Sequence, residues 1–248
     1  MNNIAVDIEN VSFRYSANAT STLSEINLKI SEGESFGLFG PNGAGKTTLM
    51  SLMTGLISAD KGSIKLLGRT IGTKKKIINR FFGFVPQDFS FYHELSTVEN
   101  LEFFGAWAGL NSKEIKSRTE ELLKILGLVD VKDKQVQNFS GGMKRRVNLA
   151  IGVIHKPQIL FLDEPTVGVD VQARHAIIDY LKDINKQGTT LIYTSHLLSE
   201  AEELCDQIAL IDNGKIIVQG DLKELIKKNG HENLENLFLD LTGKDYRN

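Results

Sequence analysis

The stretch Gly40-Pro41-Asn42-Gly43-Ala44-Gly45-Lys46-Thr47-Thr48 decides the fold of this chain. It follows a short apolar run at residues 35–39 and opens a segment of helical character at residues 47–56. The spacing G-x-x-x-x-G-K-[ST] between a strand and a helix is typical of a phosphate-binding loop, or P-loop. The sequence therefore predicts a site for a nucleoside triphosphate.

Each residue type in this loop suits an anion. Gly40, Gly43 and Gly45 allow backbone conformations with positive φ, so successive N–H groups can point at one phosphate. The N-terminus of the following helix adds a positive partial charge. Lys46 is expected to place a full charge beside the β- and γ-phosphates, and the Thr47 hydroxyl can ligate Mg²⁺. An ordinary Gly-rich turn with a solvated lysine would need neither this spacing nor both flanks.

Composition restricts the class of protein. The 248 residues are 41% hydrophobic and 24% charged, which is typical of a folded globular chain. The net charge of −2 gives no general attraction to nucleic acid or to an anionic membrane. We interpret the basic clusters at 74–76 and 144–146 as solvated faces. The single cysteine, Cys205, excludes an internal disulfide and suits a reducing compartment.

The sequence also bears on the relation to membranes. No stretch approaches the roughly 20 apolar residues that a membrane-spanning helix requires. The N-terminus lacks a basic segment followed by an apolar one, so no signal peptide is visible. We therefore expect a cytoplasmic protein whose role at a membrane, if it has one, is peripheral.

The order of strand and helix patterns predicts the fold class. Alternating apolar residues at 6–15 and 23–30 indicate antiparallel strands, whereas apolar runs at 159–162 and 189–194 indicate buried strands. Residues 97–154 read as helices at 97–108, 112–126 and 141–154. We predict an α/β P-loop core of mainly parallel sheet with an antiparallel β layer and an inserted helical subdomain. The predicted boundaries are 1–88 and 156–220 for the core, 89–155 for the helical subdomain and 221–248 for a C-terminal helical tail.

Two adjacent carboxylates follow the apolar run at 159–162. Downstream of a P-loop, Asp163 can hold Mg²⁺, directly or through water, and Glu164 can orient and deprotonate an attacking water. His196 follows the run at 189–194, where its imidazole could reach a γ-phosphate. A lone histidine is more often structural, so the case for His196 depends on the other motifs.

A second candidate anion site lies at Ser140-Gly141-Gly142, far along the chain from the P-loop. Ser140 is a suitable N-cap for the helix at 141–154, and the two glycines leave backbone N–H groups open. One nucleotide in one subunit does not need two such sites. The second site makes sense if it contacts the γ-phosphate of a nucleotide held by another subunit.

Taken in order, these motifs resemble the ATP-binding subunit of ATP-binding cassette (ABC) transporters over residues 4–220. The resemblance implies an ATPase that dimerises around two ATP–Mg²⁺, as a homodimer, and powers a separate permease from the inner face of the membrane. Its ATP contacts would be Tyr15, Gly40, Asn42, Gly43, Gly45, Lys46, Thr47, Thr48, Ser140, Gly141, Gly142 and Asp170. Its metal contacts would be Thr47, Gln87 and Asp163, and its catalytic residues Glu164, His196 and Gln87.

Three positions depart from the family pattern. The signature is the family's name for the loop that contains Ser140-Gly141-Gly142, and here Phe139 and Met143 replace its usual Leu and Gln. Val169 replaces the usual Leu of the D-loop, the segment that ends at Asp170. Ser-Gly-Gly-Met followed by Lys-Arg-Arg is similar to the exporter branch that handles drugs, surface polysaccharides and related lipid-linked substrates. Because the anion site needs only Ser140 and backbone N–H groups, hydrolysis is expected to survive.

Two other classes compete with transport. A nucleic-acid or chromosome-maintenance ATPase of the same superfamily usually carries a coiled-coil insertion or two tandem cassettes, whereas this chain has one cassette, no heptad run and a slightly acidic balance. We therefore expect no nucleic-acid partner. A P-loop kinase acting on small molecules would not need Ser140-Gly141-Gly142 or His196. A role in transport explains more of these motifs than either alternative.

Aromatic residues crowd the region 81–107. We expect Phe82, Phe84 and Phe103 in the core, and Phe89, Phe91 and Tyr92 in an exposed loop. An exposed aromatic cluster suits a protein interface. We predict that it forms a groove for a short permease helix, lined by Phe91, Tyr92 and Trp107. In the tail, the apolar positions of an amphipathic stretch predict a surface helix folded back on the core: Leu234, Leu237, Phe238 and Leu241.

Overall fold

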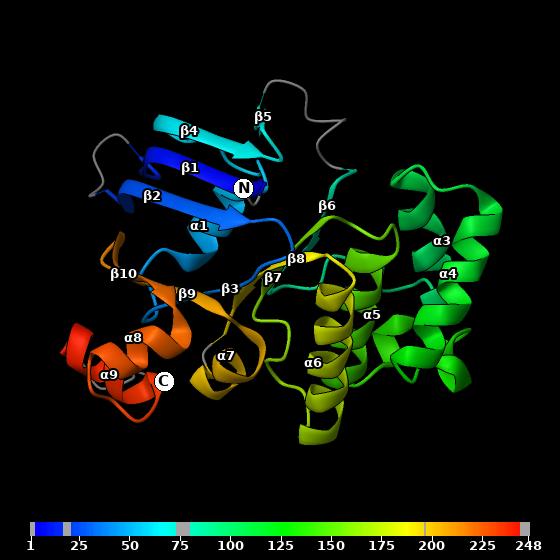
Figure 1. Cartoon of the computed structure of the whole chain (residues 1–248). Helices are drawn as coiled ribbons and strands as arrows, with labels where there is room; N and C mark the ends of the chain where they lie inside the picture. The colour runs from blue at the N-terminus through cyan, green and yellow to red at the C-terminus, as the bar shows by residue number, and fades with distance from the viewer. Residues whose placement is uncertain (1–2, 17–20, 73–79, 196, 244–248) are drawn as a thin grey trace.

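The strand that leads into the P-loop lies inside a six-stranded sheet (Figure 1). The structure is a computed structural model that describes residues 3–16, 21–72, 80–195 and 197–243. The strand order is β10 (Lys215–Asp221), β9 (Gln207–Asp212), β3 (Ser35–Phe39), β8 (Thr190–Thr194), β7 (Ile159–Asp163) and β6 (Phe82–Val85). Only β10 runs antiparallel to its neighbour. The predicted, mainly parallel core sheet is confirmed.

A second sheet is antiparallel throughout and lies beside the first (Figure 1). It has the order β2 (Leu23–Ser31), β1 (Ile4–Phe13), β4 (Lys61–Leu66) and β5 (Arg69–Thr70). Its buried residues pack with helix α1 (Lys46–Met53) and one face of the core sheet into one apolar cluster. The alternating pattern therefore buries one face of this sheet, as it does in half-solvated antiparallel sheets.

Three helices form the inserted part, which lies to the right in Figure 1: α3 (Thr97–Trp107), α4 (Ser112–Ile125) and α5 (Gly141–Val153). Ser96 and Asn111 begin α3 and α4 with capping boxes, in which side chains satisfy the free N–H groups of the first turn. Two short 3-10 turns, Val129–Val131 and Val136–Asn138, connect α4 to α5.

Helix α5 lies directly against strand β6. A Cβ atom on Gly83 would be 2.0 Å from the carbonyl oxygen of Gly152, and one on Gly152 would be 2.5 Å from Val85 Cγ2, so the close approach requires glycine at both positions. This contact sets the position of α5, and hence of Ser140 at its start, relative to Gln87 just beyond β6.

Three sequence-based interpretations are wrong. Arg145 is only 7% exposed, so the basic cluster at 144–146 is not simply a solvated face. Phe91 is 7% exposed, because its ring stacks on Phe89 and packs into the larger core cluster. Phe103 is 45% exposed, because it lies on the outer face of α3 and contacts the ring of Tyr92 instead of the core.

The remaining helices are α6 (Val171–Lys186), α7 (Leu198–Leu204), α8 (Leu222–Lys228) and α9 (Leu234–Thr242). Leu234, Leu237 and Phe238 are buried in the cluster that also contains α7, so the predicted folding of the tail onto the core is confirmed. Among the helices that the structure describes, none has the length and apolar character needed to cross a bilayer. The predicted domain boundaries stay predictions.

The burial of α9 predicts that the tail unfolds together with the core. Phe238→Ala should lower the free energy of unfolding by about 3–5 kcal/mol, because it leaves a cavity under α9. Leu241→Ala is the matched control on the same helix: Leu241 is 38% exposed whereas Phe238 is 1% exposed, so its loss should cost clearly less, about 1 kcal/mol. Urea unfolding of both variants measures the difference. Equal, small effects would mean that α9 is not part of the cooperative unit.

Candidate nucleotide-binding site

The P-loop adopts the conformation that its glycines permit. Gly43 and Gly45 have φ values of 78° and 109°, which residues other than glycine rarely adopt. A Cβ atom on Gly40 would be 2.0 Å from the carbonyl oxygen of Ile211 on β9, and one on Gly45 would be 2.6 Å from Leu23 Cδ2. The glycines are therefore required both by the curl of the loop and by the sheets beside it.

Lys46 turns back onto its own loop. Its Nζ donates hydrogen bonds to the carbonyl oxygens of Gly40 (2.8 Å) and Pro41 (3.2 Å), and the side chain is buried. Burial lowers the pKa of Lys46, whereas the carboxylates of Glu164 and Asp163 oppose this shift. The amine thus lies within the electrostatic reach of both carboxylates at the end of β7.

Strand β8 holds the carboxylate of Asp163 and the backbone of Glu164. Thr194 donates a hydrogen bond from Oγ1 to Asp163 Oδ1 (2.7 Å), and its backbone carbonyl accepts from the N–H of Glu164 (3.1 Å). Glu164 has a φ of 53°, an uncommon conformation that often marks a functional position. Gln87 Nε2 donates to Glu164 Oε2 at 2.9 Å. The predicted residues Lys46, Gln87, Asp163 and Glu164 are thus close together.

Tyr15 lies at the edge of the same loop. Its hydroxyl is 3.0 Å from Thr48 Oγ1, the residue is 67% exposed, and its ring lies nearly perpendicular to that of Phe13. The exposed ring leaves a face on which a planar base can stack. Three further predicted contact residues are also exposed at the surface of the loop and the start of α1: Asn42, Gly43 and Thr47.

The signature residues form a second group with the D-loop. Ser140 begins α5, and its hydroxyl accepts a hydrogen bond from Met143 N at 3.3 Å. A Cβ atom added to Gly142 would lie 3.7 Å from Asp170 Oδ2, and one added to Gly141 would lie 3.7 Å from the carbonyl oxygen of Gly168. Asp170 itself caps α6 by accepting from Ala173 N (2.9 Å). His196 lies outside the described residues.

Sequence reasoning missed residues that hold these groups. Arg145 Nε donates to the carbonyl oxygen of Val167 (3.2 Å), and its Nη1 donates to the carbonyl oxygen of Gln87. Asn148 Nδ2 donates to the carbonyl oxygen of Pro86 (3.1 Å). A buried carboxylate, Glu200, accepts from three hydroxyls, those of Thr166, Tyr193 and Ser195. The available signal was a polar residue inside an apolar run, as Asn148 is at 147–154.

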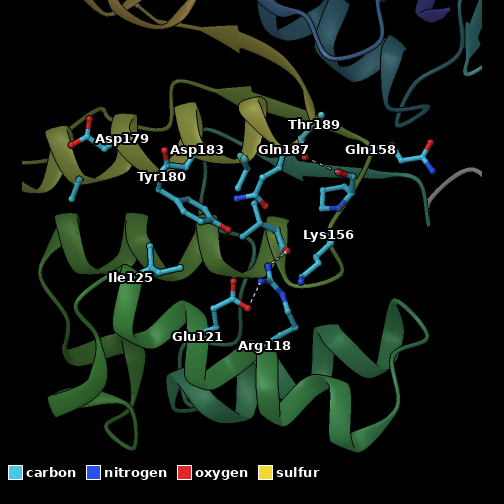
Figure 2. Close-up of a pocket in the computed structure, with 15 residues that line it drawn as sticks. Arg118, Glu121, Ile125, Lys156, Gln158, Asp179, Tyr180, Asp183, Gln187 and Thr189 are labelled. Atoms are coloured by element: carbon cyan, nitrogen blue, oxygen red, sulfur yellow. Dashed lines mark hydrogen bonds and ion pairs between the residues drawn. The ribbon is translucent and has the colours of Figure 1, made fainter.

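Cavities also open away from the predicted nucleotide site. One of about 590 Å³ opens between α4 and α6 (Figure 2). Its arginine, Arg118, is engaged: it donates to the carbonyl oxygens of Val153 (3.0 Å) and Ile154 (3.1 Å) and pairs with Glu121 at 2.7 Å. Among the described residues that line this cavity, none belongs to the predicted nucleotide site.

Comparisons with known proteins agree with this geometry. The family model described as ABC transporter matches residues 23–167. The chain is 43% identical to the linearmycin resistance ATP-binding protein LnrL of Bacillus subtilis (strain 168), over 84% of this chain and 67% of that protein. It is 36% identical to the Nod factor export ATP-binding protein I of Rhizobium sp. (strain N33), over 92% of this chain and 74% of that protein.

A solved structure shows the same fold. It is the ATP-binding cassette MJ0796 in a dimeric post-hydrolysis state bound to ADP and Pi, with a TM-score of 0.81 and 25% identity over 88% of this chain and 98% of that one. The family match covers more than half of the chain, and the phosphate loop, paired carboxylates and capped signature helix are all in place. The chain therefore belongs to the ABC transporter family, as one of its ATP-binding, ATP-hydrolysing subunits.

Proposed function

We propose that this subunit hydrolyses ATP through Glu164 and drives export through a separate membrane permease. The observation that carries the proposal is the hydrogen bond from Gln87 to Glu164, within electrostatic reach of Lys46 and Asp163. The export direction rests on the names of relatives, one of which is a Nod factor export protein. In this role the subunit works in the cytoplasm, on the inner face of the membrane.

Each residue of the site has a defined task. Lys46 exchanges its two loop carbonyls for β- and γ-phosphate oxygens, and the exposed ring of Tyr15 stacks on adenine. Glu164, oriented by Gln87, accepts a proton from the attacking water. His196 is proposed to contact the γ-phosphate. The signature residues and Asp170 face the nucleotide held by a second subunit.

The donor set fits Mg²⁺. Thr47 offers a hydroxyl, Asp163 a carboxylate and Gln87 an amide, all of them hard oxygen donors. In the described part of the chain, no three His, Cys, Asp or Glu side chains are grouped to hold a metal by themselves. This agrees with an ion held largely by phosphate oxygens, as Mg²⁺ usually is. When bound, Mg²⁺ would neutralise phosphate charge during hydrolysis.

Removing the proposed base should stop turnover without preventing binding. Glu164→Gln keeps the shape of the side chain but cannot accept the proton, so kcat should fall by about a hundredfold or more. ATP affinity, measured by equilibrium titration with Mg²⁺, should stay within about threefold of wild type. Size-exclusion chromatography should show an ATP-dependent dimer that persists. Hydrolysis at a near wild-type rate would rule out Glu164 as the base.

The two groups of residues make different contacts, which suits a composite site built from two subunits. Within one subunit the signature glycines contact the D-loop, and Lys46 contacts its own loop and the carboxylates. The dimeric MJ0796 cassette supports pairing of two subunits around nucleotide. We propose that two copies of this chain pair so that Ser140 of one copy faces the nucleotide on Lys46 of the other.

Mixing two inactive variants tests this arrangement. Lys46→Ala should lose phosphate binding, and Ser140→Arg should block the signature site, so each homodimer should be inactive. A mixed dimer of the two contains one complete site, with Lys46 from one copy and Ser140 from the other. ATPase activity should therefore reappear on mixing and increase with protein concentration. Activity that never returns, together with a wild-type rate per subunit independent of dilution, would indicate a self-sufficient monomer.

The structure also revises the proposed permease groove. A cavity of about 260 Å³ lies where α1, β6, α3 and α5 meet, and its lining includes Leu56, Phe84, Phe104, Trp107 and Ile151. Trp107 is 69% exposed and Leu56 is similarly exposed. The lining does not include Tyr92, and Phe91 belongs to the core. Trp107 thus stays in the prediction, and an apolar groove of this kind suits a short amphipathic helix of the permease.

Substitutions in this groove should separate binding of the permease from hydrolysis. Trp107→Ser with Leu56→Ser should weaken co-purification with the proposed permease by about tenfold or more, because large apolar anchors dominate interfaces. Basal ATPase should stay within about twofold, since neither side chain contacts the nucleotide site. Ile125→Ser, an exposed apolar change on α4, is the matched control and should bind normally. Undiminished binding by the double variant would place the permease elsewhere.

A further inference from the structure

Arg145 lies where three segments of the proposed site meet. It is on the second turn of α5, the helix that begins at Ser140. Its Nη1 donates to the carbonyl oxygens of Gln87 and Pro86, in the loop after β6. Its Nε donates to the carbonyl oxygen of Val167, in the loop that leads from Glu164 to Asp170. One planar side chain thus joins both loops to the helix.

The surroundings of Arg145 are built to keep a charge in place. The side chain is buried, and its guanidinium carbon lies 4.9 Å from the centre of the Phe89 ring, a cation–π contact. Burial lowers the pKa of Arg145, whereas the carboxylates of Glu164, Asp88 and Asp163 oppose this shift. Burying a cation costs free energy unless its N–H groups are hydrogen-bonded, so the guanidinium of Arg145 favours the arrangement in which its acceptor carbonyls stay in place.

We propose that Arg145 is a positioning residue for hydrolysis, which fixes the Gln87 loop and the D-loop to the signature helix. The inference rests on the proposed roles of Gln87 and Ser140. As a consequence, Gln87, which acts on the subunit's own nucleotide, moves together with Ser140 and Asp170, which face the nucleotide of the partner subunit. A guanidinium suits this task because its N–H groups point in fixed, different directions, whereas an ammonium offers a single point of contact.

The next residue supplies a matched control. Arg146 is on the same helix and also donates to backbone carbonyls, those of Leu126 (2.8 Å) and Gly127 (3.5 Å). These acceptors follow α4, so Arg146 joins two parts of the helical region, and neither of these hydrogen bonds reaches a loop of the nucleotide site. Loss of either arginine removes comparable hydrogen bonds, but only loss of Arg145 should release the Gln87 loop and the D-loop.

The experiment compares Arg145→Met, Arg145→Lys and Arg146→Met. We expect kcat for ATP hydrolysis to fall by about tenfold or more in Arg145→Met and by a smaller factor in Arg145→Lys, which keeps the charge and one contact. ATP affinity, measured in the Glu164→Gln background, should change by no more than about threefold. Arg146→Met should keep kcat within about twofold of wild type. Melting temperatures of all variants, by circular dichroism, separate positioning from loss of folded protein.

The outcomes are distinguishable. Equal kcat in Arg145→Met and Arg146→Met, per folded molecule, would overturn the inference, as would a fall in activity that follows the melting temperature alone. If Arg145→Met does not fold, Arg145→Lys decides: a reduced kcat at unchanged affinity supports the inference, and a wild-type kcat overturns it. Glu164→Gln, assayed in parallel, tests the proposed function separately. If it still hydrolyses ATP, the assigned base is wrong whatever the arginine variants show.

Discussion

Parallel pairing of β3, β8 and β7 is the constraint on which the site depends. Because parallel strands end at the same edge of a sheet, the P-loop, Asp163 and Glu164 come together there although they are distant in sequence. In the register of β7 and β8, Asp163 lies opposite Thr194. The Thr194 hydroxyl can therefore donate a hydrogen bond to Asp163, the proposed metal ligand. The close approach of α5 to β6 at Gly83 and Gly152 adds the signature helix to the same frame.

Behind the catalytic edge lies a second, wholly buried polar group. The carboxylate of Glu200 accepts from Thr166, Tyr193 and Ser195, and lies 3.3 Å from Arg174 on α6. Burial and the neighbouring negative charge of Glu200 raise the pKa of Tyr193 well above its ordinary value, so Tyr193 keeps the proton that it donates to Glu200. The three hydroxyls converge on Glu200 Oε2, whereas Oε1 makes the ion pair with Arg174, so several elements are held at one buried carboxylate. Through Thr166, this network supports the segment that follows Glu164.

Much of the fold and the contents of the site were predictable because they follow from local rules. The P-loop spacing, the apolar run before Asp163 and the N-cap at Ser140 all have short-range causes, and the structure contains each of these elements. The errors are long-range. Nothing local to Lys144-Arg145-Arg146 shows that the middle residue is covered by two loops from other parts of the chain. Likewise, which face of α3 carries Phe103 toward solvent depends on α4 and α5, which pack against the other face.

The groove between α1 and α3 has a consequence for how the protein can be observed. Trp107 is the only tryptophan in the chain, and it lines that groove with most of its surface exposed. The tryptophan emission of the whole protein therefore comes from one indole at one surface. Burial of an exposed indole shifts its emission to shorter wavelength, so binding of a peptide in the groove would be detected as a blue shift of the Trp107 emission. The chain therefore carries a single intrinsic fluorophore at the groove proposed for the permease.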